Sequence, residues 1–96
     1  MKKLPVDMEY LTSMLSGLLE LPSPSGYTDR VVHVVSDELD RMGLRYEITR
    51  RGAIRATLPG ALQKPARALI AHLDTLGAMV KALKPNGRLE VVPIGH

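Results

Sequence analysis

The sequence predicts an α/β fold made of two amphipathic helices, a β-hairpin and a buried central strand, in that order. Three patterns predict it. Apolar residues recur at helical spacing up to residue 42, apolar and polar residues alternate over residues 44–49 and 54–58, and an aliphatic run fills Ala68–Ala71. Such a run is typical of a strand that is covered on both faces. In open α/β sheets, the carboxyl end of such a strand borders the crevice where ligands bind.

The two helices are predicted from their ends and their apolar stripes. The first is expected over Met8–Glu20, because Asp7 can cap its first turn and Pro22 cannot continue it. The second is expected over Thr28–Met42, with Gly43 as its C-terminal cap. Each stripe must pack against another part of the protein. The stripe residues are Leu11, Met14, Leu15, Leu18 and Leu19 in the first helix, and Val31, Val35, Leu39 and Met42 in the second.

Two β-hairpins are predicted on either side of the central strand. Alternation over Leu44–Thr49 and Ile54–Leu58, with Arg-Arg-Gly in the turn, predicts the first hairpin. Ala78–Leu83 and Arg88–Val92, joined by Lys-Pro-Asn-Gly, predict the second.

Composition excludes several classes of function. The 96 residues include no cysteine, which rules out disulfides and thiolate metal sites and favours the cytoplasm. No long uncharged apolar segment is present, so we expect neither export nor a membrane partner. The formal net charge is +3, but the basic residues are scattered, and Arg50–Arg51 has no aromatic residues around it. We therefore expect no nucleic-acid partner.

The central strand is followed directly by His72, Leu73 and Asp74. If the backbone stays extended, residues two apart face the same side, so the Asp74 carboxylate can accept a hydrogen bond from the His72 imidazole. This contact fixes the tautomer and is the usual support for a metal-ligating histidine. It also fits a strand-end histidine that a nearby carboxylate merely satisfies. His33 lies one helical turn before Asp37, and this spacing indicates a solvated pair rather than a second ligand.

Five segments occur in a characteristic order: Leu21–Gly26, the strand Ala68–Ala71, the box His72–Lys81, Pro85–Leu89 and Pro93–Gly95. In this order they closely resemble the N-terminal part of the tetrahedral-aminopeptidase family of dinuclear zinc or cobalt metallopeptidases. That family includes glutamyl aminopeptidases and proteins labelled endoglucanases. The run Leu-Asp-Thr-Leu-Gly-Ala-Met-Val-Lys, with Pro-Ile-Gly-His after it, resembles the branch linked to the osmoprotectant N-acetylglutaminylglutamine amide.

The resemblance implies a division of the chain into two parts. Residues 1–74 would be the N-terminal part of a phosphorylase/hydrolase-like, three-layer α/β/α zinc-peptidase domain. Residues 75–96 would begin an inserted β-rich dimerisation domain. The activity implied is removal of N-terminal residues from peptides by two zinc or cobalt ions, in a homo-oligomer that ranges from a dimer to a dodecamer.

By the same resemblance, His72 is a metal ligand, and Asp74 acts in catalysis by orienting it. The family's other ligands and its general base match no position in these residues, and the Leu21–Gly26 loop contributes no ligand. A catalytic zinc site needs about three protein ligands and a water molecule. The 96-residue chain by itself is therefore expected to be inactive.

Two other classes of function fit the same residues. In the first, the chain is a non-catalytic interaction or oligomerisation module whose exposed sheet edges recruit another chain. Discrete oligomers that bind no zinc would favour it. In the second, it belongs to a metallo-carboxypeptidase or deacylase of a related clan, which would cleave only N-acyl or C-terminal substrates. Hydrolysis of substrates with a free N-terminus separates the aminopeptidase from that group.

Overall fold

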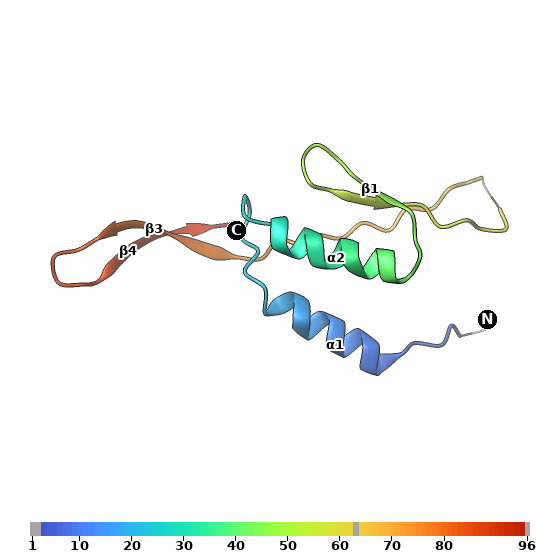
Figure 1. Cartoon of the computed structure of the whole chain (residues 1–96), viewed down its shortest axis with the longest axis horizontal. Helices are drawn as coiled ribbons and strands as arrows, with labels where there is room; N and C mark the ends of the chain where they lie inside the picture. Colours follow the sequence, from blue (N-terminus) through green and yellow to red (C-terminus); the bar gives the residue numbers. More distant parts are fainter. Residues whose placement is uncertain (1–2, 63, 96) are drawn as a thin grey trace.

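The computed structural model describes residues 3–62 and 64–95, and its helices and strands confirm an α/β fold (Figure 1). The molecule measures 63 × 32 × 25 Å and has a radius of gyration of 18.1 Å, well above the roughly 13 Å of a compact domain of about 100 residues. The elements are α1 (Met8–Leu19), α2 (Asp29–Arg41), β1 (Tyr46–Ile48), β2 (Ile54–Ala56), β3 (Gly77–Leu83) and β4 (Leu89–Ile94).

Helix α1 begins at its predicted cap, where the Asp7 carboxylate accepts a hydrogen bond from the Tyr10 backbone N–H at 2.9 Å. It runs antiparallel to α2 (Figure 1). Only one side of its stripe, Met14 and Leu18, is half-buried. The prediction that Leu11, Leu15 and Leu19 are buried is wrong, because the stripe is wider than the surface one neighbouring helix can cover.

Among the described residues, the small hydrophobic core is provided by helix α2. Val31 is the one apolar side chain that is buried there, with 1% of its surface exposed. Met42, which was expected on the buried side, is exposed, because the helix ends at Arg41. Gly43 has φ of 70° and provides the predicted C-terminal cap. Neither described helix has the length and apolar character needed to cross a membrane.

A polar cluster joins the two helices. The Tyr10 hydroxyl donates to Glu38 Oε1 at 2.6 Å, and Arg41 Nε donates to Glu38 Oε2 at 2.8 Å. The Arg41 hydrogen bond, followed by that from Tyr10, lowers the pKa of Glu38 from 4.5 to about 2. The hydrogen bond to Glu38 in turn raises the pKa of Tyr10 above its ordinary value of 10.0. Both shifts mean that the cluster is strongest with Glu38 ionised and Tyr10 neutral.

The cluster predicts how stability depends on pH. Glu38 has a lowered pKa in the folded state, so its contribution is complete above 4.5 and is lost as the pH falls toward 2. Tyr10 has a raised pKa, so its contribution is lost as the pH rises above 10.0. We expect Tyr10→Phe to lower the urea midpoint at neutral pH and to flatten both limbs of its pH profile. If stability falls as steeply at low and high pH in Tyr10→Phe as in the unsubstituted chain, the cluster is not the cause of this pH dependence.

Both predicted hairpins are present, with ends that differ from prediction. Strands β1 and β2 are only three residues each and pair antiparallel, with Ile48 opposite Ile54. Strands β3 and β4 are longer, pair antiparallel from Gly77 opposite Ile94, and have an irregularity between Val80 and Ala82. The β3–β4 hairpin projects away from the helices at one end of the molecule (Figure 1). The two hairpins form separate sheets.

The predicted central strand is not formed in this structure. Ala68–Ala71 has no regular secondary structure, and the side chains of Leu69 and Ile70 are 103% and 94% exposed. A strand exists only where a neighbour takes up its backbone hydrogen bonds. Within residues 3–62 and 64–95, neither two-stranded sheet includes this segment. The three-layer arrangement implied by the family resemblance therefore remains a prediction.

Candidate functional site

The site is built where the loop after α1 meets the segment that precedes β3. Pro24 and Thr75 form a parallel bridge, and the Thr75 backbone N–H donates to the Ser23 carbonyl at 2.9 Å. The Ser23 hydroxyl donates to the Leu73 carbonyl at 3.2 Å and lies 3.3 Å from Thr75 Oγ1. Ser23 is completely buried, with 0% of its surface exposed. The hydrogen bonds of one buried serine therefore tie the loop to both sides of Asp74.

Because Ser23 is buried, its replacement should lower the free energy of unfolding. Ser23→Ala removes the hydrogen bond from the buried hydroxyl to the Leu73 carbonyl, and such a bond contributes about 0.5–1.5 kcal/mol to stability. We expect a loss of that order in the free energy of unfolding, measured with urea. Ser16→Ala, at an exposed position on α1, is the matched control and should change stability little. Equal effects of the two substitutions would contradict the role assigned to Ser23.

Two glycines shape the loop and its neighbour. Gly26 has φ of 88°, and the Tyr27 N–H donates to the Pro24 carbonyl at 2.8 Å, which closes a tight turn. Positive φ at the third turn residue is the requirement of a type II turn. At the start of β3, a Cβ added to Gly77 would lie 2.6 Å from the Pro24 Cβ. The two segments thus approach more closely than a larger residue at position 77 allows.

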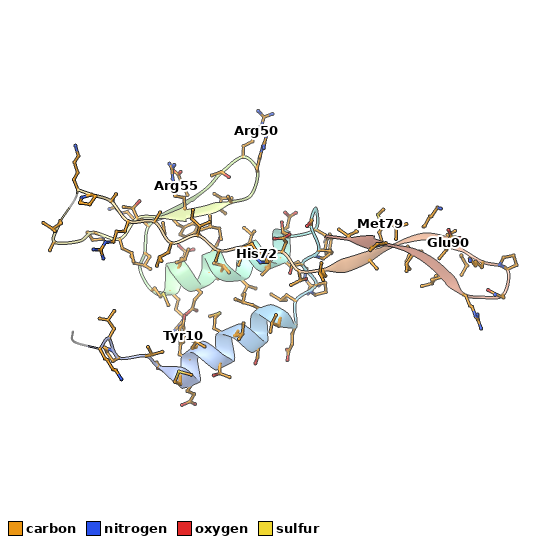
Figure 2. All side chains as sticks on the ribbon, turned by 180° about the vertical axis from the view of Figure 1, so that it is seen from behind. Tyr10, Arg50, Arg55, His72, Met79 and Glu90 are labelled. Atoms are coloured by element: carbon orange, nitrogen blue, oxygen red, sulfur yellow. The ribbon has the colours of Figure 1, made fainter. Side chains whose placement is uncertain are left out.

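His72 and Asp74 lie in contact within this segment. His72 Nδ1 is 2.9 Å from the Asp74 carbonyl oxygen and 3.2 Å from Asp74 Oδ1. Both oxygens are acceptors when the carboxylate is ionised, so Nδ1 must carry the proton. The Nε2 lone pair is then left free. Figure 2 shows His72 near the middle of the molecule, and its side chain is 85% exposed rather than covered by apolar groups.

The other carboxylate oxygen of Asp74 is also held. The Ser25 hydroxyl donates to Asp74 Oδ2 at 2.8 Å. This hydrogen bond is the main cause of the lowered pKa of Asp74, and hydrogen bonds from its own backbone N–H and from His72 act in the same direction. Sequence reasoning missed Ser25, because it expected no ligand from the Leu21–Gly26 loop and gave the loop no other role. The only signal was the hydroxyl-rich Pro-Ser-Pro-Ser-Gly sequence itself.

The described residues do not hold a metal by themselves. No group of three His, Cys, Asp or Glu side chains in residues 3–62 and 64–95 is arranged to bind one. His72 fits the part of a single ligand, since its free Nε2 is exposed and its Nδ1 is anchored. His33 Nε2 lies 3.6 Å from Asp37 Oδ2, and both side chains are exposed, as expected of a solvated pair.

Comparison with known proteins identifies the family. Residues 52–96, which include His72 and Asp74, match the M42 glutamyl aminopeptidase family. The chain is 39% identical, over 82 residues, to YhfE of Bacillus subtilis, a protein provisionally named an aminopeptidase; the match covers 85% of this chain and 24% of YhfE. Over residues 52–96 the chain resembles the M42 peptidases. The resemblance to glutamyl aminopeptidases in the sequence is thereby confirmed.

Two further relatives carry names of specific aminopeptidases. A glutamyl aminopeptidase of Lactococcus lactis is 28% identical over 86 residues, covering 88% of this chain and 24% of the relative. A lysyl aminopeptidase of Pyrococcus furiosus is 33% identical over 87 residues, covering 85% and 23%. The chain spans about a quarter of the length of the relatives it matches.

Proposed function

We propose that this chain belongs to a metal-dependent aminopeptidase, in which His72 is one ligand of a dinuclear zinc or cobalt site. The observation that carries the proposal is the contact of His72 Nδ1 with two acceptors, the Asp74 carbonyl oxygen at 2.9 Å and Asp74 Oδ1 at 3.2 Å. In the neutral ring these acceptors favour the proton on Nδ1, which leaves the Nε2 lone pair free on a side chain that is 85% exposed. A metal-ligating histidine is held in this way in most proteins. The match of residues 52–96 to the M42 family supports the same chemistry.

In this proposal the residues described here hold and orient one ligand. Asp74 remains the acceptor of the Nδ1 proton and does not touch the metal. When bound, the two ions would polarise the substrate carbonyl and lower the pKa of a bound water molecule. The remaining ligands and the general base are proposed to come from other sequence, because the described residues offer no group of three donors. The 96 residues alone should therefore not cleave peptides.

Three finer features belong to the same proposal. Residues 1–74 would be part of the catalytic α/β/α domain, with Ala68–Ala71 as a strand once neighbouring strands are present. Residues 75–96 would begin a β-rich dimerisation domain, and the projecting β3–β4 hairpin supports this boundary. The enzyme would be a cytoplasmic homo-oligomer that acts on peptides.

A chimera tests the activity. These 96 residues would replace the matching quarter of the Pyrococcus furiosus lysyl aminopeptidase, and hydrolysis of free aminoacyl anilides would be measured with zinc and with cobalt. Metal-dependent hydrolysis supports the proposal. A chimera that melts like the host but cleaves only N-acyl or C-terminal substrates points instead to a carboxypeptidase or deacylase.

A further inference from the structure

The Asp74 carboxylate is held from both sides by residues far apart in the sequence. One oxygen accepts from Ser25 at 2.8 Å, and the other lies 3.2 Å from His72 Nδ1. With only the His72 contact, a partly exposed carboxylate could rotate about its terminal bond and exchange its partner for water. With both contacts, the plane of the carboxylate is fixed.

The backbone around Ser25 is itself held in place by hydrogen bonds and close contacts. It occupies the corner of the turn closed by the Tyr27 N–H and the Pro24 carbonyl. The residue before it is bridged to Thr75, and Ser23 is buried against the same segment. The end of the second hairpin also borders the hydroxyl, since a Cβ added to Gly95 would lie 3.8 Å from Ser25 Oγ. The position of the hydroxyl is therefore set by the backbone around it.

We infer that Ser25 is a positioning residue, which aims Asp74 at His72 and thereby keeps the imidazole in the tautomer with Nε2 free. The inference deepens the proposed function, since an oriented Nε2 matters most if His72 is a metal ligand. It assigns a role to the Leu21–Gly26 loop although the loop supplies no ligand. The effect is partial, because the Asp74 carbonyl still accepts from Nδ1 at 2.9 Å when Ser25 is removed.

The test uses the metal-free 96-residue chain and reads the tautomer directly. Long-range ¹H–¹⁵N correlation spectra of the neutral imidazole give the ratio of the Nδ1–H to the Nε2–H form of His72. We expect Ser25→Ala to lower this ratio about three- to tenfold, the effect of one hydrogen bond. Ser25→Thr, which keeps the hydroxyl, should restore it. Ser16→Ala, on α1, is the control and should leave it unchanged.

A general disturbance of the fold is separated from the positioning role by Ser25→Cys. The thiol is similar in size to the hydroxyl but is a weak donor, so it should keep the backbone spectrum and still lower the ratio. If Ser25→Ala and Ser25→Cys both leave the ratio unchanged, the inference is overturned. Because no metal is present, this result is independent of the chimera experiment: either can fail while the other succeeds.

Discussion

His72→Ala should reduce metal-dependent hydrolysis by the lysyl aminopeptidase chimera about 100-fold or more. Loss of a residue that merely orients a ligand typically costs about 10- to 100-fold in metal affinity or activity, and loss of the ligand itself should cost more. The measurements are the rate of aminoacyl anilide hydrolysis and the zinc content after dialysis. Asp74→Asn, which keeps the size of the side chain but changes its charge, should give the smaller loss.

The control for this series is His33→Ala, because His33 is exposed and, among the described residues, pairs with Asp37 on its own helix. It should leave both activity and zinc content close to those of the unsubstituted chimera. Activity that survives His72→Ala at the level of this control would remove His72 from the proposed site. A loss of melting temperature shared by all three variants would indicate a folding effect instead.

Gly77→Ala should destabilise the chain by about 1–3 kcal/mol, the usual cost of an extra carbon in a closely packed contact. The added Cβ would lie 2.6 Å from the Pro24 Cβ, a distance that real carbon pairs do not tolerate. Relief requires the loop and β3 to separate, which would strain the hydrogen bond from the Thr75 N–H to the Ser23 carbonyl. Urea unfolding measures the loss, and amide exchange at Thr75 reports whether the loop has moved.

Gly17→Ala is the matched substitution. Gly17 lies inside α1, and nothing lies within 4 Å of a Cβ added to it. Alanine is favoured over glycine in a helix interior by about 1 kcal/mol, so this variant should be stabilised. The same substitution, glycine to alanine, is thus expected to change stability in opposite directions at the two positions. A stabilising effect of Gly77→Ala would mean that the close approach of loop and strand is absent in solution.

The elements predicted correctly are those specified by local sequence. The Asp7 cap, the Gly43 cap and the turns at Gly52 and Gly87 each depend on residues within a few positions, and all are present. The strand over Ala68–Ala71 depends instead on neighbours that accept and donate its hydrogen bonds. Its apolar pattern indicates a preference for burial, but within the described residues no sheet covers it.

The candidate site likewise has one contact that local sequence predicts and one that it does not. The contact between His72 and Asp74 follows from a spacing of two residues, and the structure shows it at 3.2 Å. The contact of Ser25 with Asp74 joins residues 49 positions apart, so no short-range pattern could indicate it. The roles of His72 as a ligand and of Asp74 as its orienting partner remain predictions that the variants above address.

The 49-residue separation between Ser25 and Asp74 also bears on when the site forms. Closing a loop of that length costs about 3.5 kcal/mol of chain entropy before any contact compensates for it. The helices and hairpins need only near neighbours and can form first. The Asp74 carboxylate is therefore brought to Ser25 in a late step of folding, once Thr75 has emerged and docked on the Leu21–Gly26 loop. A ribosome-bound chain that stops short of Thr75 would carry both helices but would lack this contact.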